Sequence, residues 1–183
     1  MGRALSHTHA HPHDMRLLTG SVDLFAAMVE AMDAAKHEVL LETYIFDFAG
    51  SGAEVAHALM RAAQRGVSVH VVVDGVGTGE LPEAWAAQFA LAGVQVRVFE
   101  PAVGLGFWLP SRWRRLHRKL CVVDHAVAFC GGINILDDYL DPHVDGLLKF
   151  PRLDYAVRVQ GPLVKAAHDT MTQLWSRIEA VRD

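Results

Sequence analysis

Short apolar runs alternate with helix-like segments along this chain, and this order restricts the fold more than any other feature of the sequence. The runs typical of strands lie at 38–46, 67–74, 94–99, 119–123, 126–130 and 155–160. The helix-like segments lie at 21–36, 51–65 and 82–93, and from 161 onwards. Strands that alternate with helices typically form a mainly parallel or mixed sheet with helices on both faces. The sequence therefore predicts an α/β fold of that kind.

Residue patterns also predict how the helices pack and where one of them begins. The first helix should bury one face, formed by Val22, Phe25, Val29 and Met32. The last helix should bury Leu163, Ala167, Met171, Leu174, Ile178 and Val181. The pattern Ser51-x-x-Glu54 is a capping box, which predicts the start of the second helix.

The composition is sufficient for one folded domain. Of the 183 residues, 51% are hydrophobic, which is enough for a single core. No apolar run approaches the ~20 residues that span a bilayer, and the first residues do not form the apolar stretch of a signal peptide. We expect residues 1–14, which include His7, His9, His11 and His13, to be a disordered His-rich head and residues 15–183 to be a single domain.

A hairpin is predicted where two apolar runs meet at Asp124 and His125. A two-residue turn there would place Cys121 opposite Ala128. Cys121 and Cys130 are then expected to be buried free thiols, the state typical of a reducing cytosol.

The pattern His117-x-Lys119-x4-Asp124 occurs once and carries most of the chemical information. A neutral imidazole can take a phosphoryl group covalently, and an ammonium can hold phosphoryl oxygens as charge develops on them. Side chains alternate along a strand, so His117 and Lys119 should project together while Asp124 falls on the opposite parity. We therefore interpret Asp124 as a structural group.

A second pattern, Gly131-Gly132-x-Asn134, follows closely. Glycines let backbone amides approach a phosphate or let the chain adopt a positive φ, and Asn134 offers an amide donor. A basic edge beside a strand or a Gly-Gly turn is common by itself. The two patterns together at this spacing favour a phosphodiester site.

Together these residues resemble the signature of the phospholipase D superfamily, His117-x-Lys119-x4-Asp124-x6-Gly131-Gly132-x-Asn134. The segments 41–46, 63–67, 73–75 and 154–158 are similar to bacterial cardiolipin synthases of the type without N-terminal membrane spans. The resemblance extends from about Met15 to Asp183. It implies that the fold is one phospholipase D-like half.

The resemblance further implies a two-step transfer in which two phosphatidylglycerol molecules give cardiolipin and glycerol through a phosphohistidine. It assigns catalytic positions to His117, Lys119, Asp124 and Asp154, with Asp154 orienting the histidine. It assigns phosphate binding to Lys119, Gly132 and Asn134. No metal and no other cofactor is implied for this site.

Strand ends and one loop suggest further contacts with a lipid headgroup. Glu42, Tyr44 and Asp74 lie at or near strand ends, where ligands gather in α/β sheets, although acids there are often turn or cap residues. Before the motif lies an aromatic and basic patch that includes Trp108, Arg112, Trp113, Arg114 and Arg115. Such a patch suits anionic lipid at a membrane surface and also suits single-stranded nucleic acid, or it is an ordinary loop with paired arginines. Beside a phosphodiester motif, we favour anionic lipid over nucleic acid.

The glycines of Gly75-x-Gly77-x-Gly79 do not form a dinucleotide-binding fingerprint. Glu80 occupies the position of the third glycine, and Pro82 delays the helix. The loop could still line a site, because it follows the carboxyl end of a strand.

A single motif copy is the main departure from the synthases, which carry two in one chain. One imidazole serves poorly both as nucleophile and as acid for the leaving group, because the two roles need opposite protonation states. A second motif would come from a partner half or from a homodimer, the commonest form of which has two-fold symmetry. Three functions stay open: a cardiolipin-forming phosphatidyltransferase, a homodimeric phospholipase D-like nuclease or phosphodiesterase, and a truncated, non-catalytic lipid-binding half. We expect a cytoplasmic protein, peripheral on the inner face of the cell membrane, with phosphatidylglycerol as its partner.

Overall fold

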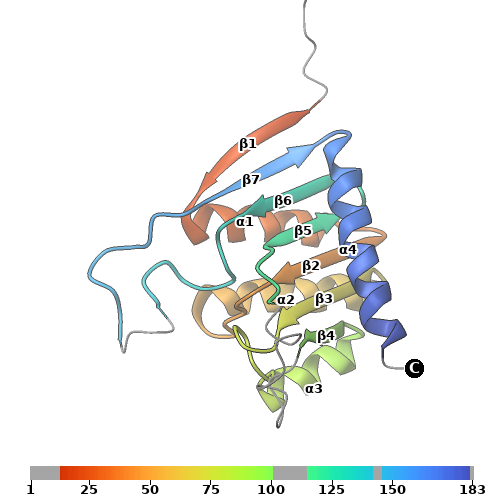
Figure 1. Cartoon of the computed structure of the whole chain (residues 1–183), viewed down its shortest axis with the longest axis horizontal. Coiled ribbons are helices and arrows are strands. Elements are labelled where there is room, and N and C mark those ends of the chain that lie inside the picture. Colours follow the sequence, from red (N-terminus) through yellow and green to blue (C-terminus); the bar gives the residue numbers. More distant parts are fainter. Residues whose placement is uncertain (1–12, 101–114, 142–145, 182–183) are drawn as a thin grey trace, which may run out of the picture.

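A seven-stranded sheet forms the centre of the protein, in the order β1-β7-β6-β5-β2-β3-β4 (Figure 1). The computed structural model describes residues 13–100, 115–141 and 146–181. The strands are β1 (Asp14–Thr19), β2 (Glu38–Thr43), β3 (Ser68–Asp74), β4 (Gln95–Phe99), β5 (Leu120–Val123), β6 (Val127–Gly131) and β7 (Tyr155–Gln160). The helices are α1 (Gly20–Ala34), α2 (Gly50–Gln64), α3 (Glu83–Ala92) and α4 (Leu163–Ala180).

The sheet is mixed, as predicted, and its parallel part is confined to β2, β3 and β4. These three strands are joined through α2 and α3, and a helical crossover returns the chain in the same direction. The other neighbouring pairs, from β2 across to β1, are antiparallel. The expected α/β fold class is therefore confirmed, with antiparallel pairing over more of the sheet than strand–helix alternation suggests.

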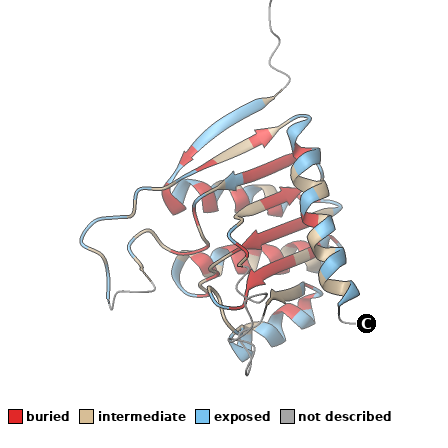
Figure 2. Ribbon diagram, viewed as in Figure 1, coloured by how far each residue is buried: buried red, intermediate tan, exposed pale blue. Residues whose placement is uncertain are grey.

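Helices cover both faces, but unequally. The helices α1, α2 and α3 lie behind the sheet in the view of Figure 1, and α4 alone crosses the front. The main core lies under the three helices, whereas the cluster under α4 is small: Leu40, Val122, Ala128, Val164 and Met171. Figure 2 shows buried residues concentrated in the inner strands and exposed residues along β1 and the outer side of α4. None of the helices in the described part of the chain is long and apolar enough to cross a membrane.

Strand β1 was not predicted, and its burial pattern explains why. It lies at the edge of the sheet, paired antiparallel with β7. Arg16 separates Met15 from Leu17 and Leu18, so the sequence shows no long apolar run, and of the six residues only Leu18 is buried. Its first residue, Asp14, lies one position before the expected start of the domain at residue 15.

Two helix faces differ from the sequence-based expectation. In α1 the buried side includes Leu24 and Met28 besides Phe25 and Met32, while Val22 is 73% exposed. The predicted face was therefore rotated about the helix axis. In α4 only two residues are buried, Val164 and Met171, because the helix contacts a narrow strip of an otherwise open sheet face.

The predicted capping box of α2 is wrong, because the cap comes from a distant part of the chain. The helix begins at Gly50, and the Ser51 N–H donates to Asp137 at 3.3 Å. In α1, the Ser21 N–H donates to Asp138 at 2.7 Å. Adjacent acids after β6 thus bind the first turns of two helices, where exposed N–H groups and the helix dipole favour a carboxylate.

The hairpin of β5 and β6 has a longer turn than expected. Val123 pairs with Val127, so three residues form the turn, and Cys121 lies opposite Phe129 rather than Ala128. Cys121 is buried, which raises the pKa of its thiol to about 12. Cys130 is exposed, so the expectation of two buried thiols is wrong for this residue.

Candidate active site

His117 and Lys119 lie in an extended segment that leads into β5, beside the carboxyl end of β2. The His117 ring stacks on Tyr44, with centroids 4.5 Å apart and an interplanar angle of 20°. The Lys119 Nζ atom lies 5.5 Å from the centroid of the same tyrosine ring. His117 is exposed and Lys119 is half-buried. Tyr44 therefore contacts both reactive side chains of the motif.

The segment that carries His117 is held by a carboxylate at the end of β3. The Leu116 N–H donates to Asp74 Oδ2 at 2.7 Å, and Oδ1 accepts from Val76 N–H at 2.8 Å and Gly77 N–H at 3.0 Å. Asp74 is fully buried. Both of its oxygens accept from backbone N–H groups, which fixes the backbone just before His117. A contact of Asp74 with a headgroup stays a prediction.

The loop after β3 lines the site through Tyr44. A Cβ on Gly77 would collide with the carbonyl and the ring of Tyr44, so only glycine allows this approach. The Thr78 Oγ1 donates to the Tyr44 carbonyl at 3.0 Å and accepts from the Phe46 N–H at 3.0 Å. These contacts fix the backbone around the tyrosine.

The Gly-Gly pair is required for packing against β7. A Cβ on Gly131 would meet the backbone of Tyr155 and Ala156, and a Cβ on Gly132 would meet the carboxylate of Asp154. Neither glycine has a positive φ. The two glycines are therefore not needed for a positive φ. They allow the backbone to approach the neighbouring strand closely.

Asn134 and Asp154 both follow these glycines in the sequence. The Asn134 Oδ1 accepts from the Ile45 N–H at 3.1 Å, so the donor left to the side chain is its –NH2 group. Burial lowers the pKa of Lys119, while the charge of nearby Asp154 acts to raise it. Asp154 also accepts from the Tyr155 N–H at 2.7 Å. No hydrogen bond joins Asp154 to His117, both of which are described, so an orienting role for this carboxylate stays a prediction.

Glu42 is a buried acid beside the motif. Its side chain is 1% exposed, and burial raises its pKa to about 7, although Arg118 acts in the opposite direction. The Arg118 Nε atom lies 3.0 Å from Oε2, close enough for an ion pair, yet neither Glu42 oxygen has a hydrogen bond of good geometry within the described residues. We take the pair as electrostatic. Glu42 lines a pocket that Lys119 and Gly131 also line.

The third motif residue, Asp124, lies at the other end of β5. Its carboxylate accepts from the backbone N–H groups of Lys36, His37 and Glu38, each at 2.8 Å. Partial burial would raise the pKa of Asp124, but these three donors hold it below the ordinary value. Asp124 therefore has a structural position, because it joins the end of β5 to the start of β2.

A family model described as "Cardiolipin synthase, PLD-like domain" matches residues 28–151. The chain belongs to this family. Cardiolipin synthase B of Salmonella typhi is 36% identical over 152 residues, which are 83% of this chain and 36% of that protein. A cardiolipin synthase of Geobacillus thermodenitrificans is 35% identical over 159 residues, 87% of this chain and 31% of that protein. The chain thus spans about a third of the length of these curated relatives.

Solved structures share the fold, among them one described as a phospholipase D family member, Nuc. Nuc from Salmonella typhimurium gives a TM-score of 0.61 at 19% identity, over 90% of this chain and 95% of that chain. NucT from Helicobacter pylori gives 0.61 at 13% identity, over 92% and 94%. At these identities the likeness establishes the fold alone.

In this cardiolipin synthase family member, part of the predicted membrane patch cannot be placed. Trp108, Arg112, Trp113 and Arg114 lie outside the described residues. Arg115 is described, and its Nη1 donates to the Glu100 carbonyl at 3.4 Å. A membrane role for the patch stays a prediction.

Sequence reasoning missed two kinds of residue around the site of this cardiolipin synthase family member. Asp138 caps α1 and Asp137 caps α2, and only the glycines at the helix starts, Gly20 and Gly50, hint at an outside cap. The partner of Glu42, Arg118, lies within the motif itself but was not paired with it. No sequence signal links Arg118 to Glu42.

Proposed function

We propose that this chain is the catalytic half of a phosphatidyltransferase that converts two phosphatidylglycerol molecules into cardiolipin and glycerol. The observation that carries the proposal is the convergence of His117 and Lys119 on Tyr44, within a chain that the cardiolipin synthase family model matches. An exposed imidazole beside a half-buried ammonium suits attack on a phosphodiester held by its oxygens.

In the first step, His117 Nε2 or Nδ1 attacks the phosphorus of one phosphatidylglycerol. A phosphorus–nitrogen bond forms, the bond to the glycerol oxygen breaks, and glycerol leaves with a proton. In the second step, the hydroxyl of another phosphatidylglycerol loses its proton and attacks the phosphohistidine, which releases His117 and cardiolipin. Lys119 and the –NH2 group of Asn134 bind the phosphoryl oxygens in both steps, with Gly132 beside them.

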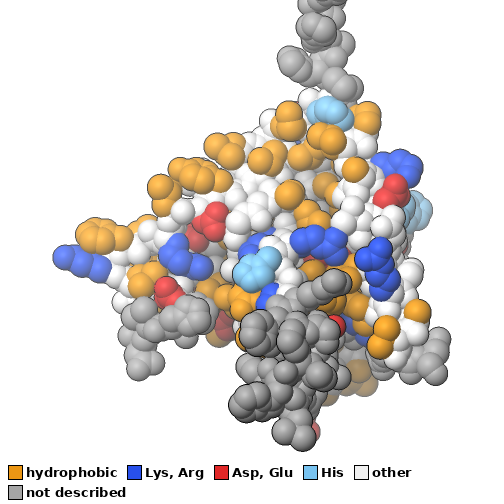
Figure 3. All heavy atoms as spheres, in the orientation of Figure 1, with side chains coloured by type: hydrophobic (Ala, Val, Ile, Leu, Met, Phe, Trp, Pro, Cys, Tyr) orange, Lys and Arg blue, Asp and Glu red, His pale blue; other side chains and the backbone are white. Residues whose placement is uncertain are grey.

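The two proton transfers require a second histidine. One imidazole cannot be nucleophile and acid together at good efficiency. A second copy of the motif, from a partner half or another copy of this chain, would supply it. The exposed apolar residues on the face crossed by α4 support such a contact: Met15, Leu17 and Tyr155. In Figure 3 apolar side chains follow β1 and β7 on this face, and Lys and Arg side chains gather nearer its centre.

We place the reaction at the inner surface of the cell membrane, where phosphatidylglycerol is the anionic lipid to be bound. Cations close to such a surface each add about 1 kcal/mol of attraction. Flotation of the chain with phosphatidylglycerol vesicles, but not with neutral vesicles, is the expected result.

The decisive experiment measures cardiolipin formation from phosphatidylglycerol vesicles with the chain in its assembled form. His117→Ala should abolish product, because no other described group occupies the nucleophile position, while His57→Ala on α2 should leave the rate unchanged. A His117→Ala variant that forms cardiolipin at the wild-type rate would contradict the proposal. The phosphohistidine itself is expected as an acid-labile label on wild-type protein given a short pulse of labelled lipid.

A second candidate is a homodimeric phospholipase D-like phosphodiesterase or nuclease. It is favoured by the match to Nuc and NucT over 95% and 94% of their chains, since one fold of this size accounts for almost all of each of those chains. Hydrolysis of a soluble diester or of DNA, lost in His117→Ala and without a lipid product, would establish it. An inactive chain that binds anionic vesicles as a monomer would instead indicate a non-catalytic lipid-binding half.

A further inference from the structure

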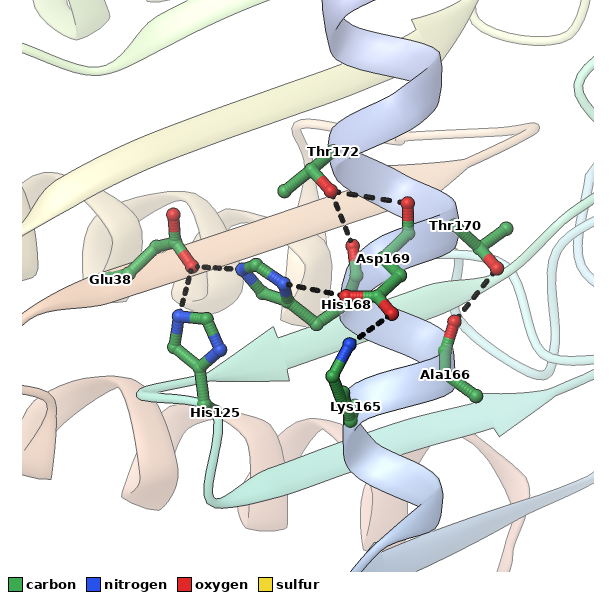
Figure 4. Close-up of polar contacts among 8 residues, drawn as sticks. All are labelled: Glu38, His125, Lys165, Ala166, His168, Asp169, Thr170 and Thr172. Atoms are coloured by element: carbon green, nitrogen blue, oxygen red, sulfur yellow. Dashed lines mark hydrogen bonds and ion pairs between the residues drawn. The ribbon is translucent and has the colours of Figure 1, made fainter.

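A second cluster of ionisable side chains lies at the opposite end of β2 from the candidate active site. It consists of Glu38 at the start of β2, His125 in the turn between β5 and β6, and His168 on α4 (Figure 4). The His168 Nε2 lies 2.8 Å from Glu38 Oε2, and the His125 Nε2 lies 3.4 Å from the same oxygen. Figure 4 shows both rings directed at the one carboxylate. Three distant parts of the sequence thus converge on one point.

The geometry of this cluster is compatible with a metal-ligand set as well as with a hydrogen bond. One ligand atom from each residue lies within 4.8 Å of the other two. Two ligands about 2.0–2.1 Å from a tetrahedral Zn²⁺ lie about 3.3 Å apart, close to the 3.4 Å between His125 and Glu38. A hydrogen bond accounts for the position of His168, but it does not explain why the His125 ring faces the same oxygen. The centroids of the two imidazole rings lie only 3.7 Å apart.

The surroundings suit an ion at the rim of the sheet. The side chains of His168 and Glu38 are 13% and 22% exposed, whereas His125 is 58% exposed, so one side of the cluster faces solvent. Three protein ligands leave a fourth tetrahedral position for water. The Asp169 Oδ1 lies 3.9 Å from His168 Nδ1, too far for a hydrogen bond but close enough to favour a positive charge on the ligand set.

We propose that Glu38, His125 and His168 bind one divalent transition-metal ion, with Zn²⁺ the best match to a His₂Glu donor set. The ion fastens α4 to β2 and to the hairpin. Such a link matters for α4, because this helix of 18 residues buries only Val164 and Met171. Glu38 and Glu42 are four positions apart on β2, about 13 Å, so the ion takes no part in phosphoryl transfer.

The test is zinc titration by calorimetry on a chain in which His7, His9, His11 and His13 are replaced by serine. This background removes the histidines of the head, which could bind zinc by themselves. We expect one zinc ion per chain. Glu38→Gln, His125→Asn and His168→Gln should each weaken binding by more than the about 10- to 100-fold typical of losing an outer partner. The matched control is His37→Asn, an exposed histidine next to Glu38, which should bind as the parent does.

Thermal melts separate loss of the site from loss of the fold. His125 has a positive φ of 53°, which asparagine adopts readily, so His125→Asn should melt as the parent does without zinc. Zinc should raise the Tm of the parent and of His37→Asn, but not of the three ligand variants, because only the folded parent site binds it. The proposal is overturned if the parent shows no saturable binding, or if the ligand variants bind zinc with the parent's affinity.

Discussion

Glu42 shows how a single buried residue can couple the candidate site to pH. Its pKa of about 7 lies above the ordinary 4.5, so the folded chain holds a proton there that the unfolded chain has already lost. The unfolded state then binds fewer protons between about pH 4.5 and 7, and stability falls as pH rises through this window. Below this pH window, the contribution of Glu42 to the free energy of unfolding is fully present.

We expect Glu42→Gln to remove this pH dependence. The free energy of unfolding of the variant minus that of wild type should increase by about 3 kcal/mol between pH 5 and pH 8. This is an upper value, because the Arg118 side chain can adjust its position when Glu42 becomes charged. Urea unfolding at the two pH values measures it, with Glu80→Gln, an exposed acid, as the control. An unchanged difference between wild type and Glu42→Gln at both pH values would contradict the assignment.

At the scale of elements, one short segment carries both a residue of the candidate site, Asn134, and the acids that cap two helices. The residues that follow Asn134 include Asp138, which accepts from the first turn of α1 at 2.7 Å. Asp138→Ala should destabilise the fold by about 1 kcal/mol, the usual cost of a lost N-terminal cap. Denaturant unfolding of Asp138→Ala beside Glu80→Ala measures this effect. Equal stability of the two variants would show that the cap contributes nothing.

The elements that sequence patterns predicted well are those whose signals are local. Strand β7 matches its expected bounds, and α3 ends at Ala92, just before Gly93, which has the left-handed φ of 90° expected for a helix-terminating glycine. The elements that failed depend on distant groups. The cap of α2 comes from Asp137, 86 positions away, and β1 is held by pairing with β7 rather than by its own apolar residues.

The candidate site divides in the same way. Strand parity predicted that His117 and Lys119 project together and that Asp124 does not join them, because both statements follow from adjacent positions. It could not predict the Asp74 contact to the Leu116 N–H, which joins the end of β3 to the motif across 42 positions. Strand parity also could not predict the contact between Glu38 and His168, because this contact depends on the path of α4 across the sheet.

At the scale of the whole molecule, the apolar surface on β1 and β7 predicts association of two copies. Leu17 is 62% exposed, and a charge at this position should be tolerated by the edge strand yet unfavourable in an interface. We expect the wild-type chain to have the mass of a dimer in solution and Leu17→Asp that of a monomer, with cardiolipin formation lost. Val22→Asp, at a position on α1 that is 73% exposed, should stay dimeric. A wild-type monomer, or a dimeric Leu17→Asp, would contradict this.

The pairing of β1 with β7 has a consequence for how the chain reaches its fold. Residues 14–19 find their partners only at residues 155–160, so the sheet is closed at this edge by one of the longest-range contacts that the chain can make. Contacts of such separation slow folding, since a long loop must be closed before they form. During synthesis, β1 must wait until residues 155–160 have left the ribosome. The edge that we propose as the dimer surface is therefore expected to be completed last, after the helices and the inner strands have already come together.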